Sequence, residues 1–271
     1  FASEFLDAYP LANVMVADEK NFHTDNRRRF MAQATLNDPD AIIVTHSSFG
    51  TIGVREESLQ GVVDDYLEQL DAALEDVEDG DRITRKKLEK RKEYFESKIL
   101  GKAAKARKDG VITFEDMGVD FLYVDEAHEF RKLDFVTNRA NVKGIDPAGS
   151  AKALDLYVKT LHLSRENPGR SHVFASGTPV VNTMAELYSI MRFMDPAALE
   201  RDGLEHFDAW ASMFGQVAAG VEQNAAGVYE TVERFSKFVN MPELMKRVRT
   251  FMDVLTSSQL GGLVKRPELS N

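Results

Sequence analysis

The sequence predicts a mixed α/β domain, in which a parallel sheet is flanked by helices. Four short apolar runs indicate buried strands, at 13–17, 41–45, 120–124 and 172–175. Unbroken apolar strands are typical of a parallel sheet covered on both faces. Helical patterns alternate with these runs, at 26–34, 151–164 and 184–193. This alternation of strands and helices favours a doubly wound arrangement.

One long insertion, residues 55–108, separates the second and third strands. It reads as two helices joined at 78–81, and in the first helix apolar residues recur at the spacing of a coiled-coil seam. The seam residues are Val63, Leu67, Leu70, Leu74 and Val77, and the second helix matches it in part with Leu88, Phe95 and Ile99.

The two arms of the insertion carry opposite charge. Residues 55–81 hold eleven acidic side chains and one basic, whereas 82–108 hold twelve basic and three acidic. We therefore expect an antiparallel helical hairpin with charges paired along its edges. Contact of the basic arm with DNA is the alternative use of that charge.

The strand patterns stop after Pro196. Residues 197–271 are expected to be mainly helical, with an apolar helix near 241–255, and the stretch 215–227, rich in Gly, Ala and Gln, is expected to be a loop. The predicted division is an α/β lobe formed by 1–54 and 109–196, the inserted hairpin 55–108, and a helical extension 197–271.

Composition limits the classes of protein to consider. The net charge of −10 does not indicate nucleic-acid binding by bulk charge, so a polyanion site must be a local patch. The absence of cysteine excludes disulfides and thiolate metal sites and is compatible with a reducing interior, so we expect a cytoplasmic location. No apolar run approaches the roughly 20 residues that span a bilayer, and no signal peptide is visible, so no membrane partner is expected.

Two adjacent carboxylates, Asp125 and Glu126, follow the third predicted strand. Ligands of open α/β sheets bind at the carboxyl ends of strands, and a nucleotide-bound Mg²⁺ would use two acids that otherwise repel each other. Asp125 would then hold the metal through its water shell, and Glu126 would orient and deprotonate the attacking water. The alternative is a solvated strand end that begins a loop.

A second polar strand end lies at 176–179, where Ser-Gly-Thr-Pro follows the fourth apolar run. Its hydroxyl groups could bond to an acid or histidine on a neighbouring strand, Gly177 would let the backbone approach closely, and the proline would end the strand. Such an element could sense the state of the 125–128 site. The alternative is an ordinary turn in which Thr178 or Asn182 caps the next helix.

These segments together resemble the Swi/Snf group of superfamily 2 helicases. The resemblance rests on Asp-Glu-Ala-His at 125–128, Ser-Gly-Thr-Pro-Val-Val-Asn at 176–182, and an apolar helix with Glu-Leu that closes at Pro196. The chain is more closely similar to very large bacterial, phage and plasmid-borne helicases that often carry a DNA-methyltransferase domain. Further matching stretches, besides the charged hairpin, lie at 26–30, 43–49, 119–128, 141–145 and 206–211.

The resemblance implies the first RecA-like lobe of an ATP-dependent DNA helicase or translocase. Asp125 and Glu126 would be the Walker B pair that acts on ATP with Mg²⁺. The resemblance also implies that ATP hydrolysis is coupled to movement on DNA by His128, Ser176, Gly177 and Thr178.

The resemblance also implies a DNA contact. Thr45, His46 and Ser47 fall in a motif that touches the phosphate backbone of the tracking strand. Contacts to phosphate carry no sequence information, which suits a motor that steps along any DNA.

Two positions depart from the pattern of the group. The stretch 129–133 has no Lys-Asn before its leucine, and Ser176 stands where threonine is usual. These departures concern the fine coupling and not the class of protein.

The sequence contains no G-x-x-x-x-G-K-[ST] pattern. In the resembled group the phosphate-binding loop would precede Phe1, and a second RecA-like lobe with the arginine finger would follow Asn271. We therefore expect this chain to be a piece of a longer protein and to be inactive by itself.

Two other functions remain open. A non-catalytic module that docks protein partners would suit the acidic charge and the missing loop, although the intact motifs oppose it. An unrelated metal-dependent hydrolase using Asp125, Glu126 and His128 would have a poor metal cage. The reading frame upstream of Phe1 separates the motor from the docking module.

Overall fold

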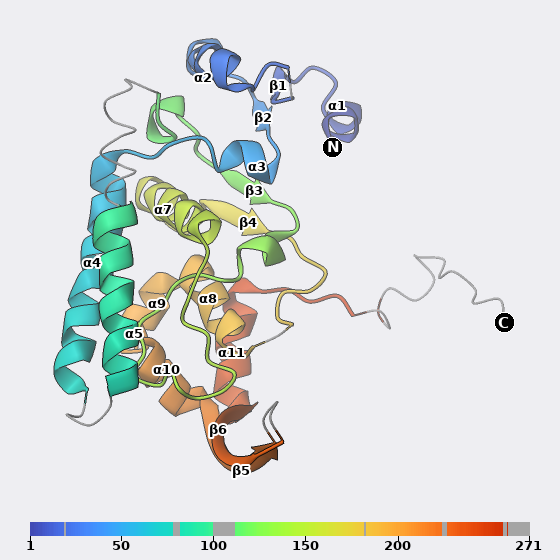
Figure 1. Ribbon diagram of the computed structural model, residues 1–271. Helices are drawn as coiled ribbons and strands as arrows, with labels where there is room; N and C mark the ends of the chain where they lie inside the picture. Colours follow the sequence, from blue (N-terminus) through green and yellow to red (C-terminus); the bar gives the residue numbers. More distant parts are fainter. Residues whose placement is uncertain are drawn as a thin grey trace.

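The computed structural model describes residues 1–18, 20–77, 82–99, 112–181, 183–223, 227–256 and 259. Within these residues the chain is a mixed α/β protein, as predicted. Figure 1 shows the strands β1 to β4 in one half, the helices α8 to α11 with a β-hairpin in the other, and the α4–α5 pair running alongside.

The predicted strands are confirmed and form two parallel pairs. β1 (Val14–Val16) pairs with β2 (Ala41–Ile43), and β3 (Leu122–Val124) pairs with β4 (His172–Phe174). The expected single sheet is not seen, because the described residues place the pairs in two separate sheets. Each strand is only three residues long and offers few backbone groups for a wider ladder.

The strands are covered less completely than the apolar runs suggested. Tyr123 of β3 and Val173 of β4 are partners in register, and they are 78% and 47% exposed. Successive side chains of a strand point to opposite faces, and α7 packs against β4, while Val124 is buried. The expectation of burial on both faces was therefore wrong at this pair.

The helices expected between the strands are confirmed. The helices and short turns of this half are α1 (Ala2–Ala8), α2 (Thr24–Asn37), α3 (His46–Phe49), η2 (Glu115–Met117), η3 (Ala127–Phe130) and α7 (Ala151–Glu166). Ser150 caps α7 by accepting a hydrogen bond from the backbone of Ala153, which satisfies one of the unpaired N–H groups at a helix start.

The inserted hairpin has the predicted antiparallel packing. It consists of α4 (Glu56–Asp76), α5 (Arg82–Glu93) and a π-helical turn η1 (Tyr94–Ile99). The rings of Tyr66 and Phe95 stack 4.8 Å apart, and Lys92 pairs with Asp71 at 2.5 Å. Along these two contacts the residue number rises in α4 and falls in the second arm, which establishes the antiparallel direction. The Lys92–Asp71 contact is a charge pair between the arms, as predicted. The join at 78–81 and residues 100–108 lie outside the described residues.

The C-terminal region contains strands that its composition did not reveal. It has the helices α9 (Pro196–Arg201), α10 (Phe207–Phe214) and α11 (Met241–Phe251), but also an antiparallel pair, β5 (Gly215–Gln223) and β6 (Tyr229–Phe238). The expected loop at 215–227 was therefore wrong for 215–223. A strand made mostly of small residues is held by its backbone ladder, which composition does not report.

Two hydrophobic clusters form the core. The first joins the strands to α2, α4 and α7, and the second surrounds α8, α10 and α11. Leu133 belongs to the first cluster and Phe135 to the second, so the chain after 125–128 passes from one cluster to the other. Among the described residues, no helix has the length and apolar character needed to cross a membrane.

Candidate functional site

The carboxylates of Asp125 and Glu126 lie exposed at the end of β3. The backbone of Glu126 has φ 50° and ψ 42°, the left-handed region. A non-glycine residue in this region costs about 1–2 kcal/mol, and such strain gathers at functional sites. The turn that follows, η3, begins with buried Ala127, so the two acids face solvent while the next residue anchors the turn.

His128 connects the two motifs that the sequence singled out. Its Nδ1 lies 3.0 Å from Oε2 of Glu126 and 3.4 Å from Oγ of Ser176. The backbone N–H of Thr178 donates to the same Ser176 oxygen at 3.1 Å. The residues predicted to couple hydrolysis to movement thus lie together, while the coupling role itself stays a prediction.

Backbone hydrogen bonds continue the β3–β4 ladder into both motifs. The Ala127 N–H donates to the Ala175 carbonyl at 2.9 Å, and the Ala175 N–H donates to the Val124 carbonyl at 2.8 Å. The 125–128 turn and the 176–179 turn therefore start from one rigid ladder.

Gly177 makes no close approach to the rest of the described chain, and its predicted part in coupling stays a prediction. A Cβ on this residue would meet no described atom within 4 Å, so no described segment packs closely against its backbone. The turn has open space on this side. Asn182, the alternative helix cap, lies outside the described residues.

Residues 45–47 also lie at this site, and each of them has a hydrogen-bond partner within the chain. Thr45 Oγ1 caps α3 by accepting from the Ser48 N–H at 3.2 Å, and it lies 3.0 Å from Ser47 Oγ. His46 Nε2 donates to the Asp125 carbonyl at 2.9 Å, and its ring lies 4.9 Å from that of Phe130. The ends of β2 and β3 thus meet, and DNA contact by these exposed residues remains a prediction.

A third carboxylate, Glu129, borders His128. Its Oε1 lies 3.8 Å from His128 Nε2, and its Oε2 accepts from Lys152 Nζ at 2.5 Å. The hydrogen bond from Lys152 lowers the pKa of Glu129, which keeps this carboxylate ionised. Within the described part of the chain, no group of three or more His, Cys, Asp or Glu side chains is arranged to hold a metal ion.

A buried polar node that the sequence did not reveal ties the hairpin to the segment after the site and to α8. Its centre is Asp134, 2% exposed. The Asp134 carboxylate pairs with Arg91 of α5 and accepts from the Gly149 N–H at 2.8 Å. The Asp134 carbonyl accepts from Tyr66 of α4 and from Arg192 of α8. A polar residue in an irregular segment gives no periodic signal, which is why sequence patterns missed it.

Comparison with known proteins shows the family of the chain. Residues 1–256 match the family model described as "Probable helicase domain". The chain belongs to this helicase-domain family. It is 26% identical over 234 residues to the Defense against restriction protein B of Escherichia phage P1, and the match covers 84% of this chain. The same match covers 10% of the phage protein, so this helicase domain spans about a tenth of that relative. No solved structure matches the chain.

Proposed function

We propose that this helicase domain is the first RecA-like lobe of an ATP-dependent DNA helicase or translocase, in which ATP hydrolysis drives movement on DNA. In this proposal, segments 1–54 and 109–196 form the lobe, 55–108 is an inserted hairpin, and 197–271 is an extension of the lobe. A second RecA-like lobe of the same polypeptide would complete the motor.

One observation carries the proposal: three segments far apart in sequence meet at the carboxyl ends of parallel strands. The His46 side chain bonds to the Asp125 carbonyl, and His128 contacts Ser176. Ligands of open α/β sheets bind at this edge. A hydrolysis motif, a sensing motif and a phosphate-contact motif would need to adjoin one another in a motor that couples ATP to DNA.

Glu126 would orient and deprotonate the attacking water, because its carboxylate is exposed and adjoins the metal-binding position. Asp125 would hold Mg²⁺ through the water shell of the ion, and adjacent exposed oxygens suit such a hard cation. When bound, Mg²⁺ would neutralise the charge that develops on the phosphates. His128 would steady the Glu126 carboxylate from 3.0 Å.

The DNA side of the proposal rests on Thr45, His46 and Ser47, which would contact phosphates without reading bases. The name of the phage P1 relative concerns defence against restriction. We extend this to a role of the complete protein in phage or plasmid DNA processing or modification, with a methyltransferase domain as a covalent partner.

The test uses the full-length protein and the Glu126→Gln variant. We expect DNA-stimulated ATP turnover to fall by a factor of about 10²–10⁴, with the affinity for ATP nearly unchanged, because the amide keeps the size of the side chain but cannot accept the proton of water.

The matched control is Glu129→Gln, which neutralises the neighbouring exposed carboxylate that pairs with Lys152. It should keep most of the turnover. Normal turnover in Glu126→Gln would contradict the catalytic role of Glu126. No ATP hydrolysis by the wild-type protein would contradict the proposal and favour a docking module.

A further inference from the structure

Glu186 is a buried carboxylate at the start of α8 (Ala185–Met194). It is 4% exposed and lies between buried Ala185 and Leu187. A carboxylate removed from water is costly unless it is paired and hydrogen-bonded. Its partners should therefore reveal why the chain places an acid here.

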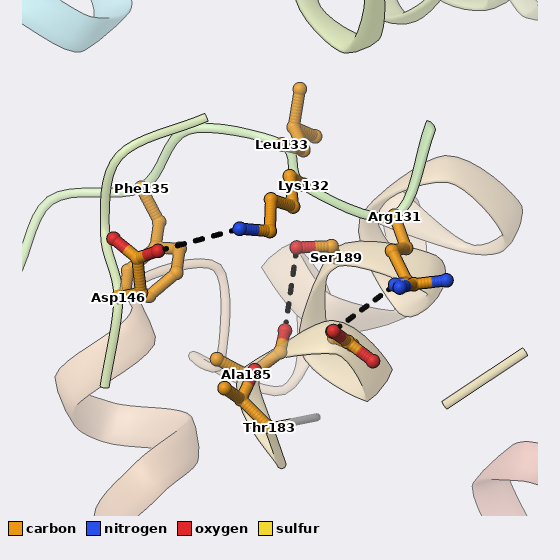
Figure 2. A pocket seen from close by; sticks show the side chains of 9 residues that line it. Arg131, Lys132, Leu133, Phe135, Asp146, Thr183, Ala185 and Ser189 are labelled. Carbon is orange, nitrogen blue, oxygen red and sulfur yellow. Dashed lines mark hydrogen bonds and ion pairs between the residues drawn. The ribbon is translucent and has the colours of Figure 1, made fainter. Parts of the chain in front are cut away.

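Both oxygens of Glu186 have partners, and the partners belong to different motifs. Oε1 accepts from Nε of Arg131 at 3.1 Å, and Oε2 accepts from the Val181 N–H at 2.7 Å. Arg131 and Glu186 both line a small pocket, and Figure 2 shows Arg131 there with the dashed line that marks its ion pair. Arg131 follows the 125–128 motif closely, and Val181 follows the 176–179 motif.

Arg131 extends the connection into the hydrolysis motif. Its Nη1 donates to the carbonyl of His128 at 3.3 Å. The path from His128 through Arg131 and Glu186 to Val181 thus joins the two motifs through polar contacts, each of which involves at least one charged group. Charge-assisted hydrogen bonds are stronger than neutral ones.

The direct contact between the motifs is weaker. Ser176 Oγ and His128 Nδ1 are 3.4 Å apart, which is long for a hydrogen bond. The Arg131–Glu186 pair is better suited to hold the motifs together, because Glu186 is buried and Arg131 is partly buried, so water screens the pair less.

We propose that Glu186 is a positioning residue that makes the 125–131 segment and the 176–181 segment move as one unit, so that DNA binding alters the rate of ATP hydrolysis. This inference rests on the proposed function, since it assigns a coupling role within the same motor. Glu186 would act through Arg131 and Val181 and would not touch the reacting atoms.

The test compares full-length wild type with Glu186→Gln, Arg131→Gln and the double variant. ATP turnover is measured without DNA and with saturating duplex DNA. The amide of the Glu186→Gln variant can still accept from Val181 but loses the charge that holds Arg131, so we expect the ratio of stimulated to basal turnover to fall at least about five-fold. Basal turnover should change by less than about two-fold.

The double variant separates coupling from independent damage. If the two side chains act through each other, the double variant should show the same ratio as the worse single variant. The matched control is Asp146→Asn, which removes the exposed Lys132–Asp146 pair, at 3.7 Å, from the same pocket wall. This control should keep the wild-type ratio.

An unchanged ratio in Glu186→Gln and Arg131→Gln would overturn the inference. So would an equal loss of basal and stimulated turnover that follows a lower melting temperature, since that pattern indicates only a structural role. No ATP hydrolysis by the wild-type protein instead refutes the proposed function, so the two failures are distinguishable.

Discussion

The hydroxyl group of Tyr66 offers a sharp probe of how the inserted hairpin is held. It donates to the Asp134 carbonyl and accepts from Arg192 Nη1 at 3.0 Å. The change Tyr66→Phe removes these two hydrogen bonds and leaves the ring stacked on Phe95. It therefore tests the polar node and not the aromatic packing.

The expected loss follows from the two bonds. A neutral buried hydrogen bond contributes about 1 kcal/mol, and one with a charged donor about 1.5–3 kcal/mol. Arg192 keeps the Asp134 carbonyl as an acceptor, which recovers part of the second contribution. We expect the free energy of unfolding to fall by about 2 kcal/mol and the melting temperature by roughly 4–6 °C.

Urea denaturation and thermal melting of the 271-residue chain provide the measurement. The control is Tyr94→Phe, at a tyrosine of the same hairpin whose ring packs against Phe95 and whose hydroxyl makes no hydrogen bond within the described residues. Its effect should stay within about 0.5 kcal/mol. A Tyr66→Phe loss as small as that of the control would refute the stabilising role of the node.

The same variant can be tested through the pH dependence of the free energy of unfolding at alkaline pH. Burial raises the pKa of Tyr66 to about 12, against 10.0 for an ordinary tyrosine. The unfolded chain therefore releases this proton first, and the free energy of unfolding should decrease as pH rises from about 10 towards 12. Tyr66→Phe should make this decrease shallower, and an identical slope would contradict the burial of the phenol.

Two further predictions concern stability. A Cβ on Gly149 would lie 2.3 Å from the Asp134 backbone nitrogen, so Gly149→Ala should lower the free energy of unfolding in urea by about 1–3 kcal/mol. The control Gly61→Ala, within α4, should raise it by about 0.5–1 kcal/mol. Equal effects of the two changes would contradict the close contact at Gly149. Burial lowers the pKa of His172, so the free energy of unfolding should fall as pH drops below about 6.5, and His172→Gln should flatten that dependence in melts between about pH 5 and 7.

Local patterns predicted the elements whose signal is local. The apolar runs located all four parallel strands, because each strand is a short hydrophobic segment followed by polar residues. The heptad spacing and opposite charges of the hairpin arms predicted their antiparallel packing, and Val63, Leu70 and Val77 of the seam are buried. The same residues that set the pattern make the contacts.

Features that depend on distant partners were missed. The β5–β6 pair is defined by a backbone ladder and by Phe235, which packs in the second cluster. Asp134 looks like any loop aspartate until Arg91 and Gly149 surround it. One contact that was missed did have a local signal. Thr45 lies three residues before Ser48, the spacing at which a threonine side chain caps a helix, and this is the cap of α3.

The segment from Asp125 to Arg131 explains why the proposed motor needs no long pathway between its sites. At one end of the segment the Asp125 carbonyl accepts a hydrogen bond from the His46 ring, which also packs against Phe130. At the other end Arg131 holds Glu186 of α8. Coupling requires an element with two arrangements that both sites bias. We propose the turn 125–131 as this element, because it contacts both the predicted DNA-binding residue His46 and Glu186 of α8, so that a shift of Glu126 on hydrolysis would be passed to both contacts.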